Sequence, residues 1–252
     1  MKFSIVTATL NSQGTINKTL ESIVSQNFDD YEVIFVDGHS TDNTINLINN
    51  SSIKNKTIIS QNGKGVYSAF SEGIKCANGE IILIINSDDY FKETNSLFEI
   101  NDIFVNYPKI SIFISNVEMI NSKKNIIRNY KSNNFKKFMF YFGHMPPHPG
   151  VFIRKEIYEK YGLFNEHFEN AGDFEFLVRI ILKLKIDFKI IKKCFIQMSY
   201  GGKSNKNLKS FFTNTVEIKK ALEMNNVRTS YFLIIIRFII KIFQFSILTR
   251  GK

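Results

Sequence analysis

The chain has 252 residues, of which 44% are hydrophobic and 22% charged, with 4 prolines and 13 glycines. This composition excludes a disordered, collagen-like or low-complexity protein, and the length suffices for one large domain or two small ones. The net charge of +10 is uneven, because residues 1–180 carry 18 Lys and Arg against 20 Asp and Glu, whereas residues 181–252 carry 15 against 3. The positive charge therefore belongs to the last third, where it favours a membrane surface over nucleic acid as the partner.

Two further features bear on the compartment. The two cysteines, Cys76 and Cys194, are too few for a disulfide framework, which favours a reducing compartment. The first residues run directly into a strand-like segment, without the long apolar region of a secretory signal. We expect a cytoplasmic protein.

Strand-like and helix-like segments alternate through the first 120 residues. Short apolar runs predict strands at 3–10, 31–36, 57–60, 80–86 and 111–120. Apolar residues at helical spacing predict the helices between them, at 15–26, 41–50, 67–76 and 95–106. This alternation predicts an α/β fold with a mainly parallel, doubly wound sheet, a type that binds its ligands at the carboxyl ends of the strands.

Polar residues follow each of the first four predicted strands. In chain order these are Thr9 and Asn11, Asp37, Lys64 within a Gly-Lys-Gly loop, and the run Asn86, Ser87, Asp88 and Asp89. The two carboxylates of the last run are suited to a hard divalent cation, and a turn with a helix cap is the alternative. Asp37 is placed to contact a base or sugar, or else belongs to a strand-to-helix turn. Lys64 either approaches phosphates or lies in a solvated loop.

Two later motifs also contain candidate site residues. A predicted amphipathic helix begins at residues 171–173, where Asp173 is either a general base projecting into a cleft or a carboxylate favoured by the helix dipole. His148 lies in a segment with three prolines, which exclude a regular helix and leave a loop that can carry a substrate contact.

These segments, in this order, resemble the inverting glycosyltransferases of family 2, which have the GT-A fold. The resemblance is closest to the bacterial branch that builds capsular, O-antigen and exopolysaccharide repeat units. It covers residues 3–204 and rests on the spaced stretches 4–11, 36–42, 63–69, 79–89, 148–154, 161–164 and 171–173. A nucleotidyltransferase is less compatible, because the first strand is followed by Thr9-Leu10-Asn11-Ser12 and not by a glycine-rich loop.

The resemblance implies a role for each matching position. Asp173 corresponds to the catalytic base, although Gly172 stands where the family usually has Glu. Asp88 corresponds to the ligand of a divalent metal, Mn²⁺ or Mg²⁺, and Asn86 to a neutral contact where many relatives have Asp. The residues implied in binding the nucleotide-sugar donor, with UDP as the expected nucleotide, are Thr9, Asn11, Asp37, Lys64, Asn86, Ser87 and Asp88. Those implied at the acceptor side or in a lid are His148, Gly202 and Ser204.

The implied organisation has two parts. Residues 1–204 form the GT-A domain, with a nucleotide-sugar-binding half at 1–120 and an acceptor or catalytic half at 121–204. Residues 205–252 form a basic, helical C-terminal region. Within it, 229–249 is an apolar segment with a narrow polar stripe of Arg237, Lys241 and Gln244, which predicts an amphipathic helix on a membrane surface. The alternative is a helix that packs in the core or forms a dimer.

Together these interpretations predict an inverting, metal-dependent glycosyltransferase of cell-surface polysaccharide synthesis. The donor is a nucleoside-diphosphate sugar, and the acceptor is a saccharide hydroxyl, with a polyprenyl-diphosphate-linked saccharide suggested by the family and the tail together. The predicted location is peripheral, at the inner face of the cytoplasmic membrane, without a nucleic-acid partner. The alternative function is a catalytically silent membrane-docking module of the same fold.

Overall fold

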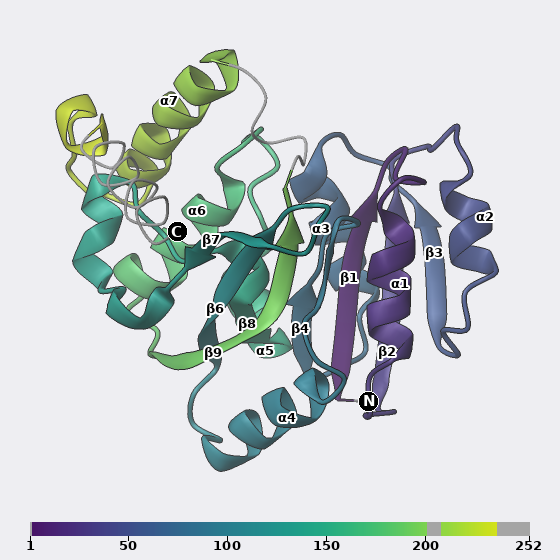
Figure 1. The fold of residues 1–252 in the computed structure, drawn as a ribbon. Coiled ribbons are helices and arrows are strands. Elements are labelled where there is room, and N and C mark those ends of the chain that lie inside the picture. Colours follow the sequence, from purple (N-terminus) through teal and green to yellow (C-terminus); the bar gives the residue numbers. More distant parts are fainter. Residues whose placement is uncertain (1, 201–207, 236–252) are drawn as a thin grey trace.

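A single sheet of nine strands forms the centre of the molecule, which is described here from a computed structural model covering residues 2–200 and 208–235 (Figure 1). Eight strands follow the order β3-β2-β1-β4-β8-β6-β9-β5, and β7 pairs with β6 beside this path. The strands are β1 Phe3–Thr9, β2 Tyr31–Asp37, β3 Lys56–Ser60, β4 Ile81–Ile84, β5 Asp89–Phe91, β6 Ile112–Ile120, β7 Ile126–Tyr130, β8 Val151–Arg154 and β9 Phe188–Ser199.

Helices connect most of these strands. The α-helices are α1 Ile16–Val24, α2 Thr44–Asn49, α3 Val66–Cys76, α4 Ser96–Asn106, α5 Lys155–Tyr161, α6 Gly172–Leu177 and α7 Leu208–Met224. Three 3₁₀ turns are η1 Ser132–Asn134, η2 Lys137–Phe142 and η3 His148–Gly150, and the π-helical turn η4 Val178–Lys183 continues α6. The nine elements predicted over residues 1–120 are all present, and the short strand β5 is an addition to them.

The sheet has a parallel half and a mixed half. β1 pairs in parallel with both β2 and β4, and β2 pairs in parallel with β3. The strands beyond β4 do not share one direction: β8 is antiparallel to β4 and β6, β9 is parallel to β6, and β5 is antiparallel to β9. The predicted parallel arrangement is therefore confirmed for the first four strands of this order, whereas the other half of the sheet is mixed.

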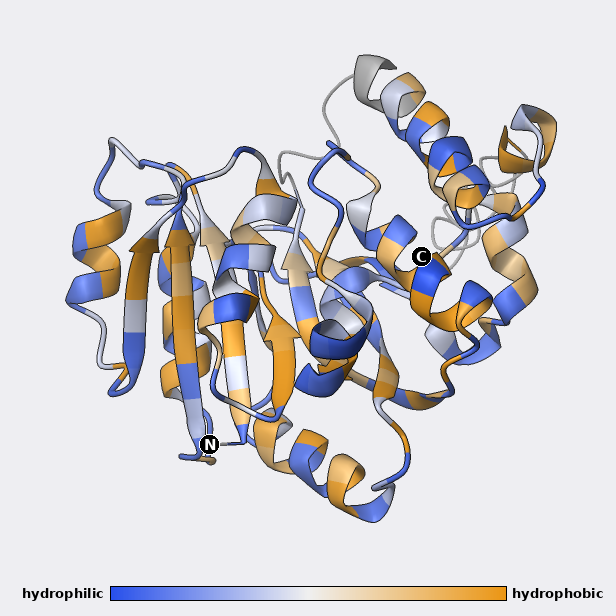
Figure 2. Ribbon diagram, turned by 180° about the vertical axis from the view of Figure 1, so that it is seen from behind, coloured by the Kyte–Doolittle hydropathy of each residue, from blue (hydrophilic) through white to orange (hydrophobic). Residues whose placement is uncertain are grey.

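Both faces of β1, β2 and β4 are buried, which explains why these strands are so apolar. Side chains alternate along a strand, so that Ile5 of β1 belongs to one hydrophobic cluster and Val6 to the other. The cluster with Ile5 also takes side chains of α1, α2 and α4, whereas that with Val6 takes side chains of α3, α5 and α6. Figure 2 shows the strands as largely hydrophobic between these two layers of helices.

One helix begins later than the sequence pattern predicts. The predicted helix starts at residue 41, but α2 starts at Thr44. The Asp42 carboxylate accepts hydrogen bonds from the Thr44 backbone N–H (3.0 Å) and the Thr44 hydroxyl (2.5 Å). These bonds hold the backbone before the helix in a turn, because a short acidic side chain competes there with the helical hydrogen-bond pattern.

The C-terminal helix α7 packs into the same hydrophobic cluster as α6. Ile218, Ala221 and Leu222 of α7 are buried in the hydrophobic cluster that also contains α6. After it, residues 231–235 are helical, with Phe232 75% exposed and Ile235 50% exposed. Among the helices of residues 2–200 and 208–235, none is long and apolar enough to cross a membrane. The rest of the predicted tail helix, at 236–249, lies outside the described residues, and the division at residue 204 stays a prediction.

Glu217 of α7 holds the loop that leads into α6. Its carboxylate accepts three backbone hydrogen bonds, from Glu169 (2.7 Å), Asn170 (2.8 Å) and Ala171 (2.9 Å). The residue after this loop is Gly172, the first residue of α6. A single carboxylate thus satisfies three consecutive N–H donors and ties the start of α6 to α7.

We expect Glu217→Ala to lower the free energy of unfolding by about 2 kcal/mol, because it removes charge-assisted hydrogen bonds and leaves partly buried N–H groups without their acceptor. Urea unfolding monitored by circular dichroism measures this change. The control is Glu223→Ala on the same helix, which removes an exposed ion pair with Lys219 and should cost less than about 0.5 kcal/mol. Equal losses in the two variants would contradict the role given to Glu217.

Another carboxylate, that of the buried Glu32, lies near the amino-terminal ends of β1 and β2. It accepts hydrogen bonds from the Ser4 hydroxyl (2.6 Å), the Asn78 backbone (2.6 Å) and side chain (3.2 Å), and the Gly79 backbone (3.2 Å). Burial raises the pKa of the Glu32 carboxyl, but these hydrogen bonds outweigh burial and bring the pKa below its usual value of 4.5.

A lowered pKa in the folded state gives stability that is present above pH 4.5 and lost as the pH falls through the folded value. Glu32→Gln should therefore lower the free energy of unfolding by about 1–3 kcal/mol at neutral pH and flatten its decline below pH 4.5. Urea unfolding over a pH series measures both effects. Glu21→Gln, which removes an exposed carboxylate, is the control; if it flattens the decline as much, the assignment to Glu32 is wrong.

Candidate active site

The carboxyl ends of β1 and β2 bring two predicted donor-binding residues into contact. Thr9 and Asp37 are register partners in the parallel pairing of these strands. The Thr9 hydroxyl (2.9 Å) and the Ser40 hydroxyl (2.6 Å) both donate to Asp37 Oδ1, and the Ser40 backbone N–H donates to Oδ2 (2.7 Å). Asp37 is only 6% exposed. This carboxylate is thus held rigidly by its own turn while it lies at the sheet edge where ligands of α/β folds bind.

Asn11 joins the same cluster from the loop after β1. Its backbone N–H donates to Ser40 Oγ (2.9 Å), and its Oδ1 accepts from the Thr41 N–H (2.9 Å). Its φ angle of 48° lies in the left-handed region, which asparagine tolerates better than most residues. Asn11 therefore joins the β1 loop to the β2 turn, and its exposed position leaves it accessible to a ligand.

The turn after β4 is tied to this cluster through Ser12. The hydroxyls of Ser12 and Ser87 are 2.8 Å apart, and the Ser12 backbone N–H donates to Thr44 Oγ1 (2.7 Å). The Asp88 carbonyl accepts from the Ser199 N–H (3.2 Å), which brings the end of β9 to the same turn. Predicted residues from β1, β2 and β4 therefore lie around one edge of the sheet.

Asp89 is a buried support for this turn. Asn86 Nδ2 donates to Asp89 Oδ2 (2.8 Å), and the Asp89 backbone N–H donates to the Asn86 carbonyl (3.0 Å). Burial raises the pKa of the Asp89 carboxyl well above its usual value, and the neighbouring Asp88 charge raises it further. The carboxylate that is half-exposed at the site is that of Asp88, whereas Asp89 is 1% exposed and orients the amide of Asn86.

The oxygen groups at this turn suit a hard divalent cation. Asp88 supplies a carboxylate, and Asn86 and Ser87 supply neutral oxygens, which is the ligand chemistry of Mg²⁺ and Mn²⁺. Within residues 2–200 and 208–235, no group of three or more His, Cys, Asp and Glu side chains is arranged to hold a metal by itself. One carboxylate and two neutral oxygens do not complete the octahedral coordination of Mg²⁺, so a metal held at this turn would need further ligands.

Lys64 lies on the exposed loop before α3. Glu72 of α3 shapes this loop by accepting hydrogen bonds from the backbone N–H groups of Asn62 (2.9 Å) and Gly63 (2.9 Å). Gly65, which precedes α3, has a φ of 82°, in a region that favours glycine. The loop thus has a defined backbone, and it holds the Lys64 ammonium in solvent beside the start of α3.

Asp173 lies at the start of α6 and contacts α3. The Tyr67 hydroxyl donates to Asp173 Oδ1 (3.0 Å), and the Phe174 backbone N–H donates to the same oxygen (2.8 Å). A Cβ at position 172 would lie 2.7 Å from the Tyr67 ring, so that only glycine fits there. This contact gives a physical reason for Gly172 in place of the glutamate usual in the resemblance.

His148 lies beside the same part of α3. Its ring stacks on Phe70 at 5.6 Å between centroids and meets Phe164 edge to face at 5.8 Å. Burial lowers the pKa of the His148 imidazole, and the Asp173 charge opposes this change. The histidine is therefore close enough to Asp173 for their charges to interact. Gly202 and Ser204, the other two residues predicted at the acceptor side, lie outside the described residues.

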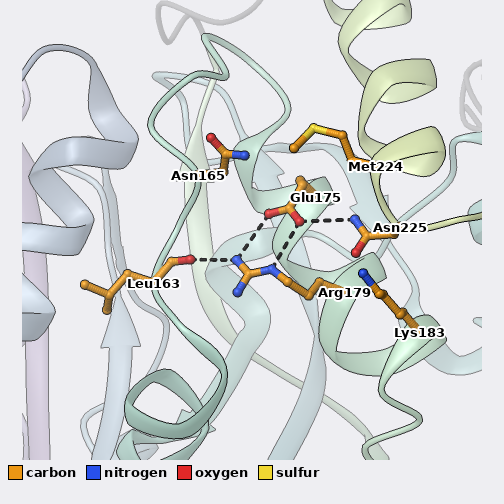
Figure 3. A pocket seen from close by; sticks show the side chains of 7 residues that line it. All are labelled: Leu163, Asn165, Glu175, Arg179, Lys183, Met224 and Asn225. Carbon is orange, nitrogen blue, oxygen red and sulfur yellow. Dashed lines mark hydrogen bonds and ion pairs between the residues drawn. The ribbon is translucent and has the colours of Figure 1, made fainter.

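A separate cavity of about 360 Å³ lies between α6, η4 and the end of α7 (Figure 3). Arg179 donates to the carbonyls of Tyr161 (2.5 Å) and Leu163 (2.6 Å) and forms an ion pair with the buried Glu175 (3.1 Å), which also accepts from Asn225 (3.1 Å). The residues that line the cavity are Leu163, Asn165, Glu175, Arg179, Lys183, Met224 and Asn225. None of the predicted site residues lines it, and its Arg–Glu pair joins α6 to the 161–163 turn.

The structure thus groups the predicted residues into two neighbouring clusters. Thr9, Asn11 and Asp37 form one, to which Ser12 and Ser87 attach the 86–88 turn. Asp173 and His148 form the other, joined through α3. The sequence patterns assigned no role to the supporting residues Ser12, Tyr67 and Glu217. They placed Asp89 beside Asp88 in a candidate cation site, whereas the structure buries Asp89 as a support of the turn. Tyr67 had a signal, its position two residues after the Gly-Lys-Gly loop, whereas Glu217 lies far from any motif.

The sequence is similar to two proteins that are named as transferases of sugars. A protein of Mycobacterium bovis (strain BCG / Pasteur 1173P2), named PGL/p-HBAD biosynthesis glycosyltransferase, is 26% identical over 181 residues, which are 70% of this chain and 68% of that protein. A Methanococcus voltae protein, named dolichyl N-acetyl-alpha-D-glucosaminyl phosphate 3-beta-D-2,3-diacetamido-2,3-dideoxy-beta-D-glucuronosyltransferase, is 28% identical over 248 residues, covering 91% of this chain and 75% of that one.

Solved structures show the same fold. S. aureus TarS 1-349 in complex with UDP has a TM-score of 0.66 at 19% identity, over 88% of this chain and 65% of that one. The mannosyltransferase PcManGT from Pyrobaculum calidifontis, in complex with GDP-Man and Mn²⁺, has a TM-score of 0.65 at 15% identity, over 88% and 63%. This chain therefore spans slightly less than two thirds of either structure, and the predicted GT-A fold is confirmed.

The family assignment rests on the sequence itself. The sequence model described as Glycosyl transferase family 2 matches residues 4–162, which is more than half of the chain. This range includes both the cluster at the ends of β1 and β2 and the turn after β4. The assignment made from spaced motifs is confirmed, and the chain belongs to glycosyl transferase family 2.

Proposed function

We propose that this protein is an inverting glycosyltransferase that moves a sugar from a nucleoside-diphosphate sugar to a saccharide hydroxyl in cell-surface polysaccharide synthesis. The observation that carries the proposal is the pair of neighbouring clusters: the Thr9–Asp37 contact and the Asp88 turn on one side, and Asp173 on the other. A donor pocket with an acidic turn beside a separate carboxylate is what a single displacement with a diphosphate leaving group requires.

The first cluster is suited to the nucleotide of the donor. Asp37 presents a carboxylate fixed by Thr9 and Ser40, and Asn11 presents an accessible amide beside it. Such groups can accept hydrogen bonds from a base or ribose. We take UDP as the expected nucleotide, in line with the TarS structures, one with UDP and another with UDP-GlcNAc.

The Asp88 turn is suited to the diphosphate. Asp88, with Asn86 and Ser87, would hold a divalent cation, Mn²⁺ or Mg²⁺, which when bound neutralises charge on a departing nucleoside diphosphate. The PcManGT structure, which contains GDP-Man and Mn²⁺, supports this expectation. Lys64 lies on the loop before α3, from which its flexible ammonium can reach phosphate oxygens.

Asp173 is suited to the role of general base. Its Oδ1 accepts two hydrogen bonds, from Tyr67 and Phe174, and these fix the direction of the other oxygen, Oδ2. We assign to Asp173 the removal of the proton from the acceptor hydroxyl, as that oxygen attacks the anomeric carbon from the side opposite the diphosphate. One displacement inverts the anomeric configuration and needs no second carboxylate as a nucleophile.

We assign the acceptor to the lipid-linked class and the site of action to the inner face of the cytoplasmic membrane. Residues 181–252 carry 15 Lys and Arg against 3 Asp and Glu. The last described turn exposes Tyr231, Phe232 and Ile235 at the start of the apolar segment 229–249, which also contains Arg237 and Lys241. Cations beside aromatic and aliphatic side chains favour binding to an anionic membrane surface.

The test of the transfer reaction uses purified full-length protein, a panel of UDP-, GDP- and dTDP-sugars and either metal. Wild-type protein should bind one nucleotide sugar and hydrolyse it slowly. Asp88→Asn should lose metal-dependent binding by at least tenfold, because it removes the charged oxygen ligand, whereas Asp173→Asn should bind the donor normally and lose transfer by at least a thousandfold. Calorimetry and product analysis measure these outcomes.

The control for both variants is Asp102→Asn on α4, a carboxylate outside both clusters, which should leave binding and transfer unchanged. The absence of binding to every nucleotide sugar, with the protein folded, would overturn the enzymatic proposal and favour a silent module of the same fold. Transfer with retention of configuration would overturn the single displacement.

The membrane proposal has its own test. The assay is co-sedimentation with vesicles of phosphatidylglycerol and phosphatidylethanolamine. The double change Arg237→Glu and Lys241→Glu should weaken vesicle binding at least fivefold, because it reverses two charges within the apolar segment. The control, Lys54→Glu and Lys75→Glu, changes the same charge at exposed positions of the donor half. Equal weakening in the two proteins would show a general charge effect and contradict a membrane-binding tail.

A further inference from the structure

The contact between α3 and α6 joins the two clusters of the proposed active site. Tyr67 is the second residue of α3 and follows the Gly63–Gly65 loop, which carries Lys64. Its hydroxyl reaches across to α6 and donates to Asp173 Oδ1 (3.0 Å). The first turn of α3 therefore follows the donor loop and carries the tyrosine whose hydroxyl contacts the carboxylate assigned as the base.

We infer that Tyr67 is a positioning residue that fixes the orientation of Asp173 for proton removal, and that Gly172 is required to make room for it. This inference rests on the proposed role of Asp173 as the general base. It concerns a residue to which the sequence motifs assign no function.

The packing around Tyr67 leaves its hydroxyl little freedom. The residue is 6% exposed, and its ring lies between Phe70 (6.2 Å between centroids, edge to face) and Phe164 (5.9 Å). Burial raises the pKa of Tyr67 well above its usual value, and the Asp173 charge adds to this effect, so the phenol stays protonated and donates. A rotamer held by aromatic packing places that donor at a fixed point.

The hydrogen bonds to Asp173 determine which of its oxygens can accept a proton. Tyr67 and the Phe174 backbone N–H both donate to Oδ1, at 3.0 and 2.8 Å. The backbone bond alone comes from the next residue of the chain and holds the carboxylate only locally. The bond from Tyr67 comes from another helix, and it therefore fixes the carboxylate relative to the donor loop and directs Oδ2 to the acceptor.

Gly172 belongs to the same arrangement. A Cβ on residue 172 would come within 2.7 Å of Tyr67 Cδ2 and Cγ, closer than real Cβ atoms approach ring carbons. Any larger residue would push the ring, and its hydroxyl, away from Asp173. The glycine therefore serves the close approach of the tyrosine ring to the start of α6.

The decisive variant is Tyr67→Phe, which keeps the ring and removes the hydroxyl. We expect kcat to fall roughly ten- to a hundredfold with the KM for the donor unchanged, because a hydrogen bond to a charged group is lost from the base and not from the donor. The split between kcat and the donor KM separates this effect from a general loss of structure, which would change KM as well.

The matched control is Tyr158→Phe. Tyr158 is a buried tyrosine of the same aromatic cluster, stacked on Phe176 at 4.9 Å, and its hydroxyl does not contact Asp173. This variant should leave kcat and the donor KM as in the wild type. If both variants lower kcat equally, or if Tyr67→Phe leaves kcat unchanged, the inference is overturned.

A second variant tests Gly172 and protects against a folding defect. Gly172→Ala in the wild type should lower kcat as Tyr67→Phe does. In the Tyr67→Phe background, Gly172→Ala should lower kcat much less, because both substitutions act through the same hydroxyl. Additive effects would overturn the role of Gly172. Asp173→Asn distinguishes failure of the inference about Tyr67 from failure of the proposed function. If Asp173→Asn is inactive while Tyr67→Phe behaves as wild type, only the inference about Tyr67 fails. If Asp173→Asn retains transfer, the proposed role of Asp173 as the base fails as well.

Discussion

The parallel pairing of β1 with β2 and β4 is the constraint on which the rest of the site depends. Because parallel strands end at the same edge of a sheet, this pairing brings the residues after all three strands together, and its register places Thr9 opposite Asp37. The strands are buried on both faces by two separate hydrophobic clusters, so a slip of one residue would turn apolar side chains into the wrong layer. The packing of the hydrophobic core thereby determines where the polar side chains at the strand ends lie.

A few long-range polar contacts also tie α6 and α7 to this frame. Tyr67 joins α3 to Asp173, and Glu217 joins α7 to the loop before α6 through three backbone hydrogen bonds. Each contact connects elements that the sheet does not order directly, since α6 and α7 follow the mixed half. The helix α7, which lies after the range matched by the family, thus supports the start of the helix that carries the proposed base.

The buried carboxylates show how environment separates groups of one chemical type. Asp37 is fixed by three hydrogen bonds at the sheet edge, and Asp89 is buried beneath the site with a raised pKa, where it orients Asn86. Glu175 is paired with Arg179 beside a separate cavity. Asp88 and Asp173, the two carboxylates assigned to chemistry, are less buried than these three, as contact with a ligand requires.

The sequence by itself determined the parallel half of the fold and the residues at its strand ends, because a period of two or of 3.6 in apolar residues is written locally and the ends of parallel strands coincide by geometry. It also indicated Asp173 and His148, through motifs whose order resembles the family. Only the tertiary structure decided the mixed half of the sheet, the place of α7, and the contacts of Tyr67 and Glu217. Tyr67 and Asp173 are 106 residues apart, and Glu217 is 46 to 48 residues from the loop that it contacts. No local pattern in the sequence encodes which distant side chains come into contact.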